Sequence, residues 1–181
     1  MVARVLLTSV AVVAATLVTS AATQDDATVA VRETNGTYTV EARFSVVEPA
    51  SIVRAVLTDY ANIPRFMPDV RTSEVLERDE GYARVEQEAV SRFMLFSKRI
   101  HLVLDVDEGA GVIRFRDTCK KSFVLYEGAW TIAERDGKTD ITYELNAHPA
   151  FSVPEFVIRK LLSRDARVMI DRLRTAIGAS R

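Results

Sequence analysis

The side chains that could do chemistry in this sequence are few, and they match no familiar catalytic arrangement. There is no Gly-x-Ser-x-Gly nucleophile elbow, no glycine-rich phosphate-binding loop and no histidine pair at metal-binding spacing. His101 and His148 are far apart in the chain, and we expect both to be surface or hydrogen-bonded residues. Cys119, the only cysteine, stands beside Lys120 and Lys121 without a partner base, so we expect no catalysis there. We therefore predict neither a metal nor a cofactor.

Four other polar side chains fall on positions that periodicity turns inward. Gln87 has the same parity as the small apolar residues around it, which directs its amide toward the interior. Asp165 lies on the apolar side of a predicted C-terminal helix, where an unpaired charge is costly. We expect Asp165 to pair with Arg172 or a sheet arginine, to direct a ligand or move a proton, or to be exposed by rotation of the helix. Tyr126 and Tyr143 can hydrogen-bond a ligand oxygen or the backbone, and with Asp165 they are the only candidates for acid–base chemistry.

The clearest element that could position these groups is a long amphipathic helix predicted over Val153–Ile177. At 1.5 Å per residue it would be about 37 Å long. Pro154 suits its first turn, and Gly178 is a natural terminator. Apolar residues recur at i, i+3 and i+4 along one stripe, while charged residues occupy the opposite side. The members of the stripe are Ile158, Leu161, Leu162, Ala166, Met169, Ile170, Leu173 and Ile177.

The residues before this helix predict strands with two short helices inserted among them. Strict alternation from Tyr38 to Val46 indicates a half-buried first strand. Pro49 then opens a short helix over Ala50 to Leu57, and residues 59–68 form a second helical piece bracketed by prolines. Period two returns after residue 69 for about 80 residues, broken by glycine-containing turns at 79–81, 109–111 and 136–138. These spacings predict consecutive antiparallel hairpins, and only the C-terminal helix is long and apolar enough to cover their apolar face.

Composition indicates the number of domains, and the first residues indicate where the protein is located. The 181 residues suit one domain, and 24 basic against 25 acidic residues leave no basic field for nucleic acid, so we predict no nucleic-acid partner. Arg4, an apolar run over Val5–Val18 and small residues at 19–22 predict a signal peptide over residues 1–22. The alternative, a membrane anchor, needs about 20 apolar residues. We expect residues 23–36 to be a leader, residues 37–178 to be the domain, and the mature protein to be periplasmic or secreted.

Several short runs resemble the START-like helix-grip (SRPBCC) superfamily, in its polyketide cyclase/dehydrase and coenzyme-Q-binding branch. These runs are Phe44-Ser45-Val46 with Pro49, residues 56–60, 63–68 and 126–130, and Tyr143-Glu144. The resemblance covers residues 38 to 177 and implies an α+β fold. In that fold a curved antiparallel sheet of about seven strands wraps round the long C-terminal helix, with two short helices after strand one. The gap between sheet and helix would be a ligand cavity.

The residues expected to line this cavity are those that point inward from the strands and the helix. They are Gln87, Leu102, Leu104, Phe115, Tyr126, Trp130, Tyr143, Asp165, Met169 and Leu173. The alternative is that they fill a solid core. Phe66 and Phe151 come from loops expected near the opening, together with Phe93 and Phe96.

Phe93–Phe96 is an apolar run between Arg92 and Lys98 at an expected strand boundary. An apolar tip with a basic collar suits the lip of a pocket or a transient membrane contact. The alternative is an ordinary strand buried on both sides.

The resemblance implies hydrophobic ligand binding, and we expect an exported carrier of a hydrophobic small molecule that is lipid-like, quinone-like or polyketide-like. The superfamily also contains cyclases, so a cyclase or dehydratase that uses the same cavity is one alternative. A closed-core interaction module that works through the basic face of the last helix is the other.

Overall fold

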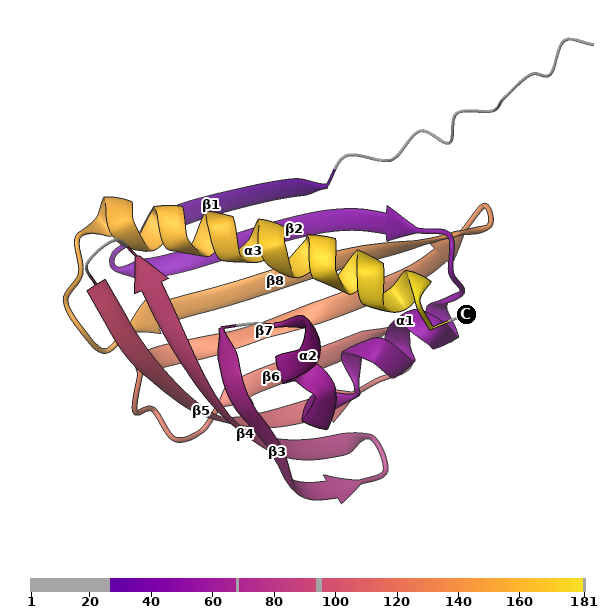
Figure 1. Cartoon of the computed structure of the whole chain (residues 1–181), viewed down its shortest axis with the longest axis horizontal. Helices are drawn as coiled ribbons and strands as arrows, with labels where there is room; N and C mark the ends of the chain where they lie inside the picture. Colours follow the sequence, from indigo (N-terminus) through magenta and orange to yellow (C-terminus); the bar gives the residue numbers. More distant parts are fainter. Residues whose placement is uncertain (1–26, 68, 94–95, 181) are drawn as a thin grey trace, which may run out of the picture.

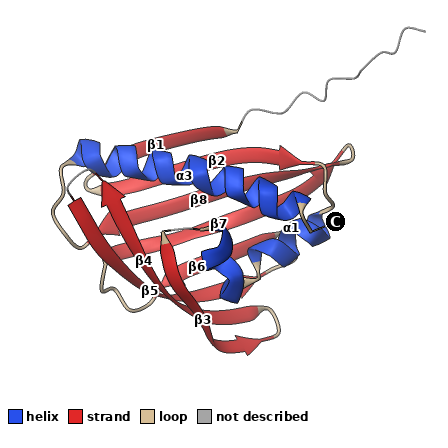
Figure 2. Ribbon diagram, in the orientation of Figure 1, coloured by secondary structure: helices blue, strands red, loops and turns tan. Residues whose placement is uncertain are grey.

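A curved antiparallel sheet and one long helix laid across it make up most of the structure (Figure 1). The computed structural model describes residues 27–67, 69–93 and 96–180, without the side chains of Phe66, Phe93 and Phe96. The predicted signal peptide lies outside the described residues. Figure 2 shows the helices gathered on the same side of the sheet. The α+β helix-grip architecture predicted from the sequence is therefore confirmed.

The sheet has eight strands in the order β1-β2-β8-β7-β6-β5-β4-β3, and every neighbouring pair is antiparallel. The strands are β1 (Thr28–Thr34), β2 (Thr37–Val46), β3 (Val70–Asp79), β4 (Tyr82–Phe93), β5 (Phe96–Glu108), β6 (Val112–Asp117), β7 (Phe123–Arg135) and β8 (Lys138–Pro149). The helices are α1 (Ala50–Leu57), the 3₁₀ turn η1 (Tyr60–Asn62), α2 (Ile63–Phe66) and α3 (Glu155–Gly178). The two short helices and the long last helix lie where the sequence predicted them.

Strand β1 is the main difference from the sequence prediction, which placed a leader at residues 23–36 and about seven strands. Residues 28–34 instead pair with β2, from Thr28 opposite Arg43 to Thr34 opposite Thr37. Asn35 and Gly36 form the connecting turn, both with positive φ, at 52° and 79°. Asn-Gly is the preferred pair for a two-residue hairpin, because both positions need a left-handed backbone. The leader assignment was thus wrong for these residues.

Periodicity decides which side of each element is buried. Alternate residues of β2, from Tyr38 to Val46, are buried, and alternate residues of β5, from Ile100 to Val106, are buried as well. On α3, Ile170 and Ile177 have no exposed surface. The apolar face of the sheet and the apolar stripe of the helix therefore meet as expected, and together they form one core.

The short helices are held to the sheet by a half-buried charge cluster around Glu108. The guanidinium of Arg54 donates to the backbone oxygen of Glu108 at 3.0 Å, and Arg78 lies 3.0 Å from its carboxylate. Tyr60 donates its hydroxyl to Glu108 Oε1 at 2.9 Å. This cluster therefore joins α1 and η1 to strands β3 and β5.

Gly128 offers a test of how closely β7 and its neighbours approach. A Cβ added there would overlap the backbone oxygen of Glu144 and lie 2.6 Å from Cζ of Phe115. We expect Gly128→Ala to lower the free energy of unfolding by about 1–3 kcal/mol, because an overpacked sheet must shift its backbone. Urea melts measure the change. Gly178→Ala is the matched control, since a Cβ there would lie 3.9 Å from Oε1 of Glu48, an ordinary van der Waals contact. Equal stability of the two variants would show that β7 can move away from β8.

Candidate ligand-binding cavity

A cavity of about 460 Å³ lies between α3 and the sheet, and its wall is predominantly apolar. This volume falls in the range of small-molecule sites, about 300–1,000 Å³. From α3, apolar residues of its first four turns face the space, among them Ile158, Leu162 and Met169. The α2–β3 segment contributes Met67 and Val70. The predicted gap between helix and sheet is therefore present, and the core is not solid throughout.

The sheet supplies the floor of the cavity from its central strands. Apolar floor residues come from β2, β5, β7 and β8, and they include Val40, Ile100, Leu102, Phe123 and Leu145. Two tyrosines, Tyr126 on β7 and Tyr143 on β8, also face the cavity. The phenol rings are backed by Phe115, whose ring centroid is 6.0 Å from that of Tyr126 and 6.2 Å from that of Tyr143.

The tyrosine hydroxyls are polar groups in a mostly apolar floor, and each phenol affects the pKa of the other. Burial raises the pKa of Tyr126 to about 12, against an opposing effect of the neighbouring Tyr143. Burial raises the pKa of Tyr143 well above its usual value, and the contact with Tyr126 adds to the shift. A phenolate in this apolar site would lose its hydration, so both groups stay neutral and serve as hydrogen-bond donors.

Charged residues gather at the rim, where α3 passes the ends of β3, β4 and β5. They are Asp69, Arg92, Lys98, Arg164 and Asp165. Arg164 donates to Oδ1 of Asp165 from Nε at 2.8 Å and from Nη2 at 2.7 Å, and its Nη1 donates to the backbone oxygen of Arg92 at 3.1 Å. The predicted partners of Asp165, Arg172 or a sheet arginine, were therefore wrong. The adjacent helix residue, Arg164, is the partner.

Asp165 is half-buried and lines the cavity. Burial raises the pKa of its carboxyl group, and Asp69 nearby adds to this shift, while Arg164 opposes it. Both bonds from Arg164 go to Oδ1, and a carboxylate has further lone pairs that can accept a hydrogen bond. The rim thus presents a hydrogen-bond acceptor to the cavity, whereas the tyrosines of the floor present donors.

The structure brings half of the predicted site residues to the cavity. Those that line it are Gln87, Leu102, Tyr126, Tyr143, Phe151, Asp165 and Met169. Leu104 and Leu173 instead lie buried in the packed part of the core, and Phe115 lies behind the two tyrosines. Trp130 packs on the ring of Tyr143 at a centroid distance of 4.4 Å. Phe66, Phe93 and Phe96 were also predicted, but their side chains lie outside what the structure describes.

Several lining residues were missed by the sequence analysis. Ile100 shares the parity of Leu102, and Leu161 and Leu162 belong to the apolar helix stripe, so their inward direction was readable. Asp69 and Arg164 carried no such signal, because charged residues near a loop or on a helix edge are usually solvated. Their place at the rim depends on how α3 crosses the sheet.

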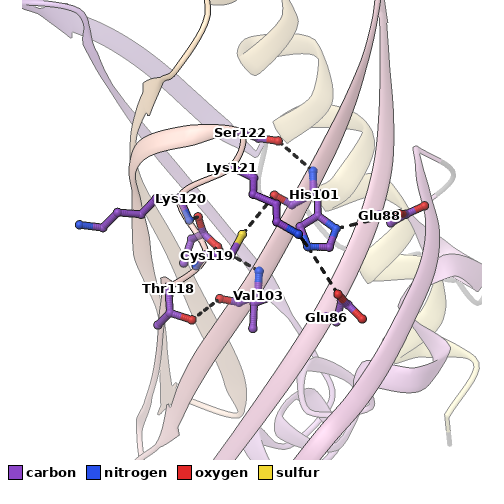
Figure 3. A network of polar contacts seen from close by, with 10 residues as sticks. Glu86, Glu88, His101, Val103, Thr118, Cys119, Lys120, Lys121 and Ser122 are labelled. Atoms are coloured by element: carbon purple, nitrogen blue, oxygen red, sulfur yellow. Dashed lines mark hydrogen bonds and ion pairs between the residues drawn. The ribbon is translucent and has the colours of Figure 1, made fainter.

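Both histidines and Cys119 lie away from the cavity wall. His101 belongs to the outer face of the sheet, with Nε2 3.4 Å from Glu86 and 3.2 Å from Nζ of Lys121 (Figure 3). The thiol of Cys119 contacts the backbone oxygen of His101 at 3.7 Å. His148 is hydrogen-bonded to Thr37 at 3.2 Å. These contacts confirm the prediction that the histidines are hydrogen-bonded residues.

Within the described ranges, no group of three or more potential metal ligands comes together. The helices of that same part of the chain include none that is long and apolar enough to cross a membrane. Neither finding assigns a ligand to the cavity.

A family model described as polyketide cyclase/dehydrase and lipid transport matches residues 48–174. The chain belongs to this family. The matched region runs from just before α1 into the last turns of α3, so it includes both the floor and the helix that roofs the cavity. A search of curated proteins finds no match.

Solved structures with the same architecture include, by their titles, a lipid transfer protein and an aromatase/cyclase. The STAR-related lipid transfer protein of Xanthomonas axonopodis has a TM-score of 0.72 at 17% identity, over 85% of this chain and 94% of that one. A START superfamily protein of Mycobacterium smegmatis gives 0.67 at 15%, over 78% and 97%. The Streptomyces aromatase/cyclase Zhui gives 0.63 at 19%, over 80% and 93%. At these identities the likeness shows the START-like fold alone.

The raised pKa of Asp165 predicts a pH-dependent effect of Asp165→Asn. The folded protein holds the Asp165 proton more tightly than the unfolded chain, whose value is near 3.8. The stability linked to this group is therefore complete below that pH and is lost as pH rises through the folded pKa. We expect Asp165→Asn to unfold at a higher temperature than the parent near pH 7, with the difference vanishing at acidic pH.

Thermal melts at several pH values measure this difference. Asp171→Asn makes the same charge change on the exposed side of α3 and serves as the control. A parent more stable than Asp165→Asn near neutral pH would show that the bond to Arg164 outweighs the cost of burial.

Proposed function

We propose that this protein is an exported carrier that holds a hydrophobic small molecule between α3 and the sheet. The observation that carries the proposal is the apolar cavity of about 460 Å³, which a closed-core protein would fill with side chains. The family description names lipid transport, and a similar solved structure is titled a lipid transfer protein. A lipid-like, quinone-like or polyketide-like compound suits the apolar wall.

The export part of the proposal rests on the sequence of residues 1–22, with its basic start, apolar run and small-residue cleavage site. N-terminal sequencing of protein recovered from periplasm or medium tests it. A cytosolic protein that begins at Met1 would contradict it.

A transient membrane contact through Phe93–Phe96 is the way in which such a carrier would exchange its ligand. Arg92 and Lys98, which flank this segment in the sequence, both line the cavity. Apolar residues within a basic collar suit an anionic bilayer surface. Co-sedimentation with anionic vesicles tests the contact, which Phe93→Ser with Phe96→Ser should weaken. Unchanged sedimentation of this double variant would refute it.

A second candidate function is a cyclase or dehydratase that uses the same cavity. Asp165 favours it, because a carboxyl group with a raised pKa that faces a substrate cavity suits proton transfer. A similar solved structure is titled an aromatase/cyclase, which supports this candidate. Incubation with a linear poly-β-ketone mimic separates the functions, since a carrier returns the compound unchanged and a cyclase converts it through Asp165.

We expect Ala166→Phe to block ligand uptake. Ala166 is 5% exposed and lines the cavity from α3, so a phenyl group there would occupy the space. Affinity for Nile red should fall by at least about tenfold, because the dye and the new ring compete for one volume. Fluorescence titration measures the affinity, and mass spectrometry after denaturing extraction shows whether a copurifying lipophilic compound is lost.

Thr175→Phe is the matched control, because it places the same ring on the exposed side of the same helix. It should bind Nile red as the parent does. If Ala166→Phe also binds as the parent does, the dye does not occupy this cavity, and the carrier proposal loses its main support.

A further inference from the structure

The tyrosine pair of the cavity floor, Tyr126 and Tyr143, leaves one hydrogen-bond donor without an acceptor. A phenol has one donor proton, so two phenols bring two protons to their shared contact. The two phenols affect each other's pKa, and a hydrogen bond between them can use at most one of these protons. No further hydrogen bond joins either hydroxyl to another residue that the structure describes. One O–H donor therefore remains for whatever occupies the cavity.

The surroundings of the pair make this donor selective. The adjoining floor is hydrocarbon and aromatic, with Ile100, Leu102, Phe123 and Leu145 around the space. A donor that loses water in such a site must find a new acceptor or remain unsatisfied, and an unsatisfied buried donor is costly. Arg92 and Lys98 at the rim are exposed to solvent, so water can accept their hydrogen bonds. They therefore discriminate less between ligands with and without an acceptor oxygen.

The acceptor at this position should be neutral. Both phenols remain protonated, since burial keeps their pKa values above the physiological range. A carboxylate placed against the floor would itself be buried without a cation in contact, which is costly. A carbonyl oxygen has no such cost, and its two lone pairs accept readily from a phenol.

We propose that Tyr126 and Tyr143 form a donor site that selects hydrophobic ligands bearing a carbonyl oxygen at the end that reaches the sheet. This inference rests on the proposed ligand-binding function and narrows its ligand class to ketone-like or quinone-like molecules over pure hydrocarbon chains. Such a ligand lies with its oxygen against β7 and β8 and its apolar body under α3.

Fluorenone and fluorene test the proposal, because they have nearly the same shape and differ in one carbonyl group. Displacement of Nile red gives the affinity of each. The parent protein should prefer fluorenone by about tenfold to a hundredfold, the usual effect of an unpaired buried donor. The double variant with Tyr126→Phe and Tyr143→Phe should bind both compounds equally, since it has no donor left to satisfy.

Tyr82→Phe is the control variant, because Tyr82 does not line the cavity. Its hydroxyl donates to Oδ1 of Asp105 at 2.9 Å. It should keep the preference of the parent. Infrared spectra of bound fluorenone give a second measurement that needs no variant. The carbonyl band should lie below its position in an apolar solvent, because a hydrogen bond weakens the C=O stretch.

The outcomes separate this inference from the proposed function. If the parent binds neither compound, the carrier proposal fails and the tyrosine site fails with it. If the parent binds both equally, or if the carbonyl band is unshifted, the tyrosine site is overturned while the carrier proposal stands. A preference that persists in the double variant also overturns the site.

Discussion

The structure depends on how α3 lies against the sheet, because this one helix closes the core at one end and roofs the cavity at the other. In its C-terminal half, Ile170, Leu173 and Ile177 are fully packed and do not line the cavity. In its N-terminal half, Leu161 and Leu162 are only half-buried and face the open space. One continuous helix therefore contributes both to the packed core and to the wall of the cavity.

The cavity lies at one end of the core, and the other end is closely packed. An unfilled volume forfeits dispersion contacts, so the packed half must stabilise the domain by itself. The core around α1, β2 and the end of α3 does this, and the Glu108 cluster ties the short helices to the sheet. A molecule that fills the cavity would restore the missing contacts, so ligand binding and stability are coupled.

Polar groups occupy opposite walls of the cavity, and their environments give them different roles. Asp165 stands at a solvated rim with Arg164, where charge is tolerated and an acceptor oxygen faces inward. Tyr126 and Tyr143 lie on the apolar floor, where only neutral groups persist. In the proposed binding mode, a ligand lies between the tyrosine donors of the floor and the carboxylate acceptor at the rim, and the hydrocarbon wall supplies most of the contact area.

Local periodicity, together with turn residues, determined the order of the elements and the inward face of each one. Tyr38 to Val46 alternate, and the apolar stripe of α3 repeats every three or four residues, so neighbouring residues alone decide these faces. The same rules apply to β1, because Asn35-Gly36 is a preferred hairpin turn and the residues before it pair with β2. The polar character of residues 23–36 pointed instead to a leader, and the turn residues are the stronger signal.

Only the tertiary structure decided which inward residues fill the core and which face open space. Leu102 and Leu104 share one strand and one parity, yet Leu102 lines the cavity and Leu104 does not. Strand parity is the same for both leucines, so the difference depends on where α3 lies over the curved sheet. The sequence by itself therefore determined which side chains point into the interior. Which of these line the cavity was decided by the packing of helix against sheet, because that packing involves residues far apart in the chain.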